Sequence, residues 1–416
     1  MKADARHSSY RIFGLDLMRV VAIFLVLIAH TSGTFKLHAD KWSYTIDKDP
    51  VPHMGLFPDG KDLPESMQKA AAALPPGRVW IFGTAGVELF FVLSGFLIGG
   101  ILIRQVTSSP KYTIAHAGSF LVRRWFRTIP AYWFVLTFFL LLYSLVDGKP
   151  ITAQLLSYYL FLQNLNHPHP GFFGIAWSLA VEEWFYLLLP LVVFIVTSLF
   201  GGVDKIKLLL ITFIFFVFSC IVYRAFHIQP VPLGFNFDLE IRKVVLYRLD
   251  AIMYGVLAAL LVHKRKQDSD ILYQILFVAG LSISGVLIAL ALFMGPVYSA
   301  TSPSGYVAFF GVILYAALPC AFALLLPLTS RFRMGNNKAV QAVTYLSRIS
   351  YSVYLVHFYM YYLAQFRRVH FGNYFFASLF YLCYLCCVIF IATLIYYLIE
   401  KPFLKIRDKY IPLKTG

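Results

Sequence analysis

The sequence predicts an all-α integral membrane bundle of about ten transmembrane helices, with one short re-entrant or interfacial helix and with both termini in the cytoplasm. Two observations indicate this class. Of the 416 residues, 59% are hydrophobic and 13% are charged, whereas a soluble globular domain has roughly 25% charged residues. The apolar residues are also gathered into long runs separated by polar segments, which is typical of multi-pass membrane proteins.

Ten apolar runs are long enough, at roughly 17–25 residues, to cross a bilayer as helices. They lie at 12–33, 84–104, 128–146, 176–200, 207–227, 245–263, 271–294, 304–327, 344–366 and 376–399. The first run contains Asp16 and Arg19 and lacks a small-residue cleavage site, so we expect a retained helix and not a signal peptide. An eleventh run, 151–164, is too short to span and suits the re-entrant or interfacial helix.

Basic residues in short loops predict the orientation, because such residues favour the cytoplasmic side. With the N-terminus inside, the inner segments are 105–127, 201–206, 264–270, 328–343 and the C-terminal tail, and all of them carry Lys or Arg. Two pairs on the outer side, Arg242–Lys243 and Arg367–Arg368, count against this scheme. Treating 151–164 as a span would invert every later loop and place more basic clusters outside.

The domain organisation follows from these runs. We predict one membrane domain over 1–410, integral to the cell (inner) membrane, and a short tail at 411–416. Residues 34–83 form a long outer loop rich in proline, which predicts an irregular extracytoplasmic cap.

Composition also bears on partners. The formal net charge of +16 lies in loops beside apolar runs, so we expect the lipid bilayer as a partner and no nucleic acid. All five cysteines lie in apolar runs, and Cys383, Cys386 and Cys387 have no histidine or carboxylate at ligand spacing. We therefore predict no metal site.

Polar residues in the first span suggest a functional face. Arg19 and His30 are eleven positions apart, which places them within roughly 20° of one helix face and about 16 Å apart along the axis. Asp16 can pair with Arg19. The alternative is that Asp16 merely neutralises Arg19 and His30 hydrogen-bonds in the outer interface, although ionisable residues inside a membrane commonly serve a function.

Glu88 lies near the outer end of the second predicted span, at the level that His30 reaches. A carboxylate beside an imidazole fixes its tautomer and raises its basicity, so Glu88 and His30 are candidate catalytic residues. A purely structural Glu88–His30 ion pair is the alternative. In the same span Gly95 permits close helix packing.

Three arginines, Arg123, Arg124 and Arg127, precede the third predicted span on the cytoplasmic side. They can be topology signals. Together with nearby aromatic residues they also suit the phosphates and purine ring of a nucleotide-bearing donor.

Further polar positions fall on later spans and could line a cavity. Ser178, Glu182 and Tyr186 share one helix face, whereas Glu183 should point away from it. Arg248 and Asp250 start another span, where a mutual ion pair is the simplest expectation, and Tyr354 and His357 lie on a later one. A hydrogen-bond network that locks the helices together is the competing interpretation.

At this point the chain resembles the acyltransferase-3 family of integral membrane acyltransferases. The family signature in the first span, a basic residue, ten residues and then histidine, matches Arg19 to His30. The resemblance continues, in order, through GVELFFVLSGFLIG, RRWFRTIPAYW, WSLAVEEWFYLLLP, YRLDAIMYG, ISYSVYLVHF and LIEKPF. Members often carry a fused hydrolase-like domain after the last span, and we expect none here.

The resemblance implies acyl transfer, most often of acetyl, from cytoplasmic acyl-CoA to a hydroxyl of an extracytoplasmic glycan. Acyl-CoA would be a co-substrate, with no permanently bound cofactor. His30 would be catalytic, and Arg19 with the three arginines would engage the donor. Transfer could be direct or could pass through an acyl-histidine. A multi-span exporter of an envelope glycan precursor and a non-catalytic partner in envelope assembly are the alternatives.

Overall fold

The computed structural model describes residues 12–36, 80–146, 148–227, 238–265, 270–301, 308–335, 337–363 and 374–411, and every regular element within them is helical. Most of the predicted cap at 34–83 and most of the tail at 411–416 lie outside the described residues. The all-α prediction is confirmed for the part of the chain that the structure describes.

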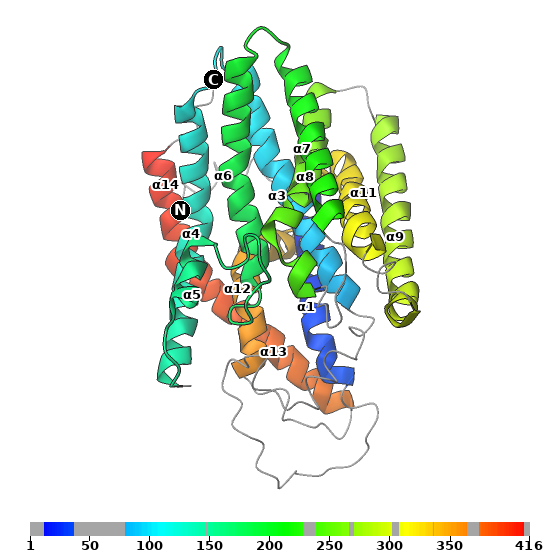
Figure 1. The fold of residues 1–416 in the computed structure, drawn as a ribbon. Helices are drawn as coiled ribbons and strands as arrows, with labels where there is room; N and C mark the ends of the chain where they lie inside the picture. Colours follow the sequence, from blue (N-terminus) through cyan, green and yellow to red (C-terminus); the bar gives the residue numbers. More distant parts are fainter. Residues whose placement is uncertain are drawn as a thin grey trace.

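The helices form one elongated bundle (Figure 1). Their bounds are α1 Phe13–Lys36, α3 Trp80–Ser108, α4 Ile114–Leu145, α5 Ala153–Leu156, α6 Ala176–Leu199, α7 Lys205–His227, α8 Leu249–Lys264, α9 Asp270–Thr301, α11 Tyr315–Thr329, α12 Lys338–Leu363, α13 Tyr374–Ile395 and α14 Lys401–Tyr410. Short 3₁₀ turns cover Ser157–Leu160 (η2) and Val245–Tyr247 (η4), and π-helical turns cover Asp238–Arg242 (η3), Ala308–Leu314 (η5) and Tyr396–Glu400 (η7).

Eight helical segments among the described residues are long and apolar enough to cross a membrane. They are Phe13–His30, Ile81–Ser108, Ile114–Leu145, Ala176–Leu199, Lys205–His227, Asp270–Phe293, Ala308–Thr329 and Ser378–Tyr410. The predicted spans 245–263 and 344–366 are not among them. The first is helical from Leu249 for only 16 residues, or about 24 Å, and the second lies in the more polar α12. The count of ten therefore stays a prediction.

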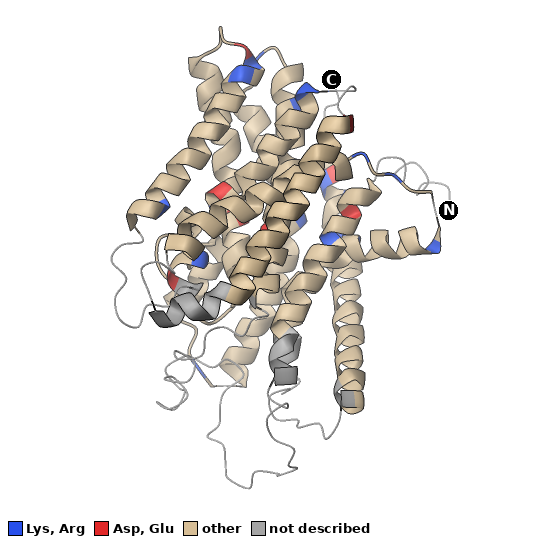
Figure 2. Cartoon of the chain, turned by 90° about the vertical axis from the view of Figure 1, so that its right-hand side faces the viewer, with Lys and Arg blue, Asp and Glu red and all other residues tan. Residues whose placement is uncertain are grey.

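The helix surfaces that face outward from the bundle are largely apolar. Large apolar side chains such as Phe215 on α7, Ile271 on α9 and Phe390 on α13 are exposed, as expected where helices face hydrocarbon. Figure 2 shows that Lys, Arg, Asp and Glu are sparse among the helices, which are drawn mostly in tan. The protein is a multi-pass membrane protein in which a small number of charges are buried among the helices.

The short run at 151–164 forms α5 and the turn η2 and does not span. Three hydrogen bonds fasten this segment to the long helices. The hydroxyl of Tyr132 donates to the Tyr158 carbonyl over 2.9 Å, and the indoles of Trp133 and Trp184 donate to the carbonyls of Tyr159 and Phe161 over 3.1 and 2.9 Å. The segment is thereby held against α4 and α6.

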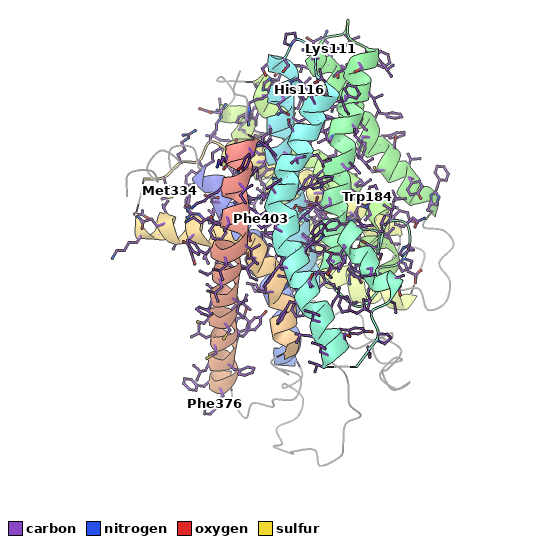
Figure 3. All side chains as sticks on the ribbon, turned by 90° about the vertical axis from the view of Figure 1, so that its left-hand side faces the viewer. Lys111, His116, Trp184, Met334, Phe376 and Phe403 are labelled. Carbon is purple, nitrogen blue, oxygen red and sulfur yellow. The ribbon has the colours of Figure 1, made fainter. Side chains whose placement is uncertain are left out.

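Helix α4 is longer than its predicted span. It runs for 32 residues through Pro130, or about 48 Å, compared with roughly 30 Å for the hydrocarbon core of a bilayer. Residues 114–127, expected as loop, are therefore helical, and the three arginines project from a rigid helix. Lys111 lies just before the start of α4 and His116 just after it, and both lie near the upper end of the molecule in Figure 3.

Helices α3 and α8 approach until their backbones touch. A Cβ atom on Gly95 would lie 1.9 Å from the Ile252 carbonyl oxygen, and one on Gly255 would lie 2.0 Å from the Val92 oxygen. No other residue type fits at either position without moving a helix. The packing role predicted for Gly95 is confirmed.

Candidate active site

Helix α1 presents one face to lipid and the opposite face to the bundle. Its exposed stripe consists of Leu17, Val21, Phe24 and Ile28. Arg19 and His30 lie on the other side, where each contacts α12, the first through Ser347 and the second through His357. Because Ser347 and His357 are ten residues apart in the same direction, α1 and α12 run parallel here, and the two ionisable groups share one interface.

The inner end of this interface is a small polar cluster. Arg19 Nη1 lies 3.1 Å from Asp16 Oδ1, so the predicted pair is present. The Ser347 hydroxyl donates to the same carboxylate oxygen over 2.6 Å, and Arg19 Nη1 lies 3.5 Å from that hydroxyl. The guanidinium is held at the α1–α12 contact and remains partly exposed.

The outer end brings two histidines together. His30 Nδ1 lies 3.1 Å from His357 Nε2 and 3.0 Å from the Val26 carbonyl oxygen. The two rings are 5.0 Å apart, and the Phe358 ring packs edge-on against His30 at 5.2 Å. His357 is fully buried, whereas His30 is half-buried.

Hydrogen bonding assigns the protons of this pair. His357 Nδ1 lies 2.8 Å from the Tyr354 carbonyl oxygen, and since a carbonyl only accepts, Nδ1 carries the hydrogen. The Nε2 of neutral His357 is then an acceptor, and it receives the hydrogen that His30 Nδ1 shares with Val26. This tautomer leaves His30 Nε2 with a free lone pair, as a general base requires.

Two sequence-predicted residues support the histidine pair from α6 and α12. The hydroxyls of Ser178 and Tyr354 are 2.6 Å apart, and the ring of Tyr354 packs 5.6 Å from that of His357. The hydroxyl of Tyr384, which the sequence analysis missed, donates to the His357 carbonyl over 2.8 Å. His357 is thus contacted by the Tyr354 ring and receives a hydrogen bond from Tyr384 at its backbone carbonyl.

The prediction that Glu88 orients His30 is wrong. Glu88 forms a buried ion pair with Arg248, whose Nη2 donates a hydrogen bond to Glu88 Oε1. A buried arginine needs a carboxylate more than a neutral imidazole does. His357 takes the place that Glu88 was expected to fill.

The expected pair between Arg248 and Asp250 is also wrong. Asp250 instead receives two hydrogen bonds, of 3.0 and 2.9 Å, from Arg224 on α7. Arg248 lies 4.0 Å over the ring of Tyr315 while it pairs with Glu88. All four charged side chains are essentially unexposed. Arg224 could have been noticed as a basic residue that lies within the apolar run 207–227 and not at its first or last position.

The three arginines of α4 face different neighbours. Arg124 Nη2 donates to the Tyr186 hydroxyl over 3.2 Å and stacks 4.7 Å over its ring. That hydroxyl donates to Glu182 over 2.7 Å and lies 2.5 Å from the Ser94 hydroxyl. The predicted lining residues Glu182 and Tyr186 therefore meet Arg124 inside the bundle.

Arg127 lies within electrostatic range of Glu400, which accepts a hydrogen bond from Ser352. Glu183, expected to point away, is buried and accepts a hydrogen bond of 2.7 Å from Thr128. It therefore joins α6 to α4 near the arginines.

Arg123 points the other way, to the C-terminal helix α14. It pairs with Asp408 at 3.3 Å and donates to the Ile411 carbonyl. Phe126 and Phe403 pack with ring centroids 6.3 Å apart at the same contact, and Figure 3 shows Phe403 lying beside α4. Arg123 thus fastens α14 to α4, which sets it apart from Arg124 and Arg127.

The described polar residues therefore connect the two ends of a membrane bundle. The interface of α1 and α12 runs from Arg19, with Asp16 and Ser347, to His30, with His357. This arrangement defines a membrane-embedded protein whose ionisable side chains are held at different depths of one helical bundle.

The family is shown by comparison with known proteins. A family model described as an acyltransferase domain matches residues 12–397, so the chain belongs to the acyltransferase-3 family. The chain is 26% identical over 291 residues, 66% of its length, to O-acetyltransferase OatA of Staphylococcus aureus (strain NCTC 8325 / PS 47). It is 33% identical over 123 residues, 26% of its length, to peptidoglycan O-acetyltransferase OatA of Listeria monocytogenes serovar 1/2a (strain ATCC BAA-679 / EGD-e).

These matches cover 45% and 19% of the two relatives, so the chain aligns with less than half of each curated protein. No solved structure matches the chain significantly.

Proposed function

We propose that the chain transfers an acyl group, acetyl in the simplest case, from acyl-CoA at the cytoplasmic side to a hydroxyl of an envelope polysaccharide at the outer side. The observation that carries the proposal is the His30–His357 pair, whose hydrogen bonds leave His30 Nε2 unprotonated. The names of the relatives, O-acetyltransferase and peptidoglycan O-acetyltransferase, support the reaction and the kind of acceptor. Family membership favours this function over the exporter alternative.

The donor would bind by its phosphates at the arginines of α4. Guanidinium groups make charge-assisted, often bidentate hydrogen bonds to phosphate. Arg124, which is held against Tyr186, and Arg127 would supply this contact, and the acyl-pantetheine arm would extend past Arg19. Arg19 and His30 are separated by about 16 Å of helix, which an extended pantetheine arm can cover.

The chemical step is a direct transfer. The acceptor hydroxyl oxygen attacks the thioester carbonyl carbon while His30 Nε2 takes the hydroxyl proton. The new C–O bond forms, the C–S bond breaks, and the leaving thiolate takes the proton from the His30 imidazolium. His357 stabilises that imidazolium by accepting from its Nδ1–H, as an orienting carboxylate does in other triads.

The reaction can be tested in inverted membrane vesicles that contain the chain. Labelled acetyl-CoA added outside should yield alkali-labile acetyl esters on glycan trapped inside, with release of one free thiol per ester. Vesicles without the chain control for background transfer. Accumulation of unmodified glycan without thiol release would instead indicate an exporter.

The donor site gives a second test, because Arg123 and Arg124 are adjacent but differ in environment. Arg124→Gln should raise the KM for acetyl-CoA by about 10- to 100-fold, the worth of one or more hydrogen bonds to a charged group. Arg123→Gln removes a partly exposed pair with Asp408 and should change that KM by less than about threefold. Equal effects in steady-state kinetics would assign both arginines to structure or topology.

A further inference from the structure

The segment Ser378–Tyr410, the last long helix of the described chain, is longer than a bilayer requires. Its 33 residues extend over about 50 Å, compared with roughly 30 Å for the hydrocarbon core. Figure 3 shows α13 and α14 as one column that passes Phe376 and Phe403. Residues 378–399 include no charged residue, whereas α14 has four basic residues and one acidic residue. We therefore expect α14 to lie at the edge of the bilayer and beyond it.

The outward face of this segment is apolar up to the start of α14. Phe390, Leu394 and Leu398 are exposed, the last of them by 71%, as expected of side chains that face hydrocarbon. Tyr397 in η7 is also exposed, and tyrosine is enriched where a membrane meets water. The Nζ atom of Lys401 lies 4.9 Å from the centre of the Tyr397 ring. Lys401 therefore marks the point at which the lipid-facing surface becomes polar.

Three lysines follow from this point at intervals of four residues. Lys401, Lys405 and Lys409 share one face of α14, and Lys405 and Lys409 are exposed. At about 1.5 Å per residue, the backbones of the three lie about 5, 10 and 16 Å beyond that of Leu398, and the headgroup layer is roughly 5–8 Å thick on each side of a bilayer. Because lysine stems are long and flexible, the ammonium groups of Lys401 and Lys405 can reach the headgroups. The ammonium group of Lys409 lies within a Debye length, about 8 Å, of them.

The opposite face of α14 is fastened to α4. At 3.6 residues per turn, Phe403 and Arg407 fall on the side of the helix away from the three lysines. Phe403 packs against Phe126, and Arg407 pairs with Asp408 at 2.8 Å. Asp408, the acidic residue of α14, also pairs with Arg123 of α4 at 3.3 Å. The acidic charge of α14 is thus engaged by two arginines, and the lysine face is held in a fixed orientation.

We propose that Lys401, Lys405 and Lys409 form a docking surface for anionic phospholipids in the leaflet from which α14 emerges. The negative headgroup complements the three ammonium groups, and the acyl chains of the same lipid lie along the exposed apolar face at Leu394 and Leu398. Since contacts with α4 already order α14, little backbone freedom is lost when a lipid binds. This inference goes beyond the proposed acyl transfer and does not depend on it.

Lipid retention by the purified protein in detergent tests this inference. The probes are phosphatidylglycerol and phosphatidylcholine with identical acyl chains, and native mass spectrometry counts the bound lipids. The wild type should bind phosphatidylglycerol at least about tenfold more tightly than phosphatidylcholine, a preference that weakens as ionic strength rises. A photoreactive phosphatidylglycerol should crosslink to peptides that contain residues 397–409.

A charge-matched pair of variants locates the effect. The double variant Lys405→Gln with Lys409→Gln should bind phosphatidylglycerol about 10- to 30-fold more weakly, the worth of two lysines near an anionic surface, and should lose the crosslink. Lys207→Gln with Lys338→Gln removes two exposed lysines from the first turns of α7 and α12 and should retain both. The charge-preserving variant Lys405→Arg with Lys409→Arg should also bind as the wild type does.

Three outcomes would overturn the proposal. Equal wild-type affinity for the two lipids would exclude recognition of a negative headgroup. Equal losses in the two glutamine variants would mean that total charge, and not the face of α14, attracts the lipid. Crosslinks confined to other helices would place the bound phosphatidylglycerol elsewhere on the bundle, and this result requires only the wild-type protein.

Discussion

Replacing His30 with alanine should lower the kcat for acyl transfer by about 10²- to 10⁴-fold, the usual contribution of a positioned general base. The structure gives the reason, because His30 Nε2 is the atom that the hydrogen bonds to Val26 and His357 leave free to accept a proton. The measurement is the initial rate of ester formation from labelled acetyl-CoA. A His30→Ala protein that elutes normally in gel filtration and transfers at the wild-type rate would contradict the assignment.

A comparison at His357 shows whether the pair acts as a unit. His357→Leu should cost about 10- to 100-fold in kcat, the worth of a hydrogen bond to the imidazolium that forms. His357→Gln offers an amide oxygen that can accept from His30 Nδ1 and should recover part of this loss. If both variants lose activity equally and their pH–rate profiles match that of the wild type, His357 serves packing only.

The second large effect concerns the buried pair of Arg224 and Asp250. Asp250→Asn should lower the free energy of unfolding by about 3–5 kcal/mol, because it leaves Arg224 charged, buried and without its bidentate partner. The double variant Arg224→Met with Asp250→Leu removes both charges and should regain most of the loss. Thermal denaturation in detergent measures each change.

An exposed pair provides the control for that experiment. Asp270, the first residue of α9, pairs with Arg331, but its side chain is 75% exposed. Asp270→Asn should therefore leave the melting temperature nearly unchanged. Equal shifts for Asp250→Asn and Asp270→Asn would mean that burial of the Arg224 pair contributes nothing special to stability.

The sequence predicted the helical membrane class, the Asp16–Arg19 pair and the common face of Arg19 and His30. These features depend on spacing along one helix, which the 3.6-residue period specifies directly. The hydroxyls of Ser178 and Tyr354, both predicted to line a cavity, do come together, 2.6 Å apart.

Prediction failed where two helices had to be set relative to each other. The position of a residue along a helix does not tell how that helix is rotated about its own axis. The sequence therefore predicts a Glu88–His30 contact, whereas the rotation of α3 directs Glu88 toward Arg248. The same limit hid the crossed pairing of Asp250 with Arg224. The sequence predicts a loop at 114–127 because charged residues interrupt the apolar run. The segment is helical in α4, since a helix can continue into water beyond the bilayer.

The contact between Gly95 and Gly255 has a mechanical consequence. Carriers work by rocking one half of the molecule against the other, which requires side-chain interfaces that can slide or part. At Gly95 and Gly255 the backbones of α3 and α8 are in direct contact. No layer of side chains separates the two helices there, so they cannot easily slide past each other. We therefore expect the bundle to behave as a stationary frame, so that in the proposed transfer the flexible thioester arm would be the part that moves.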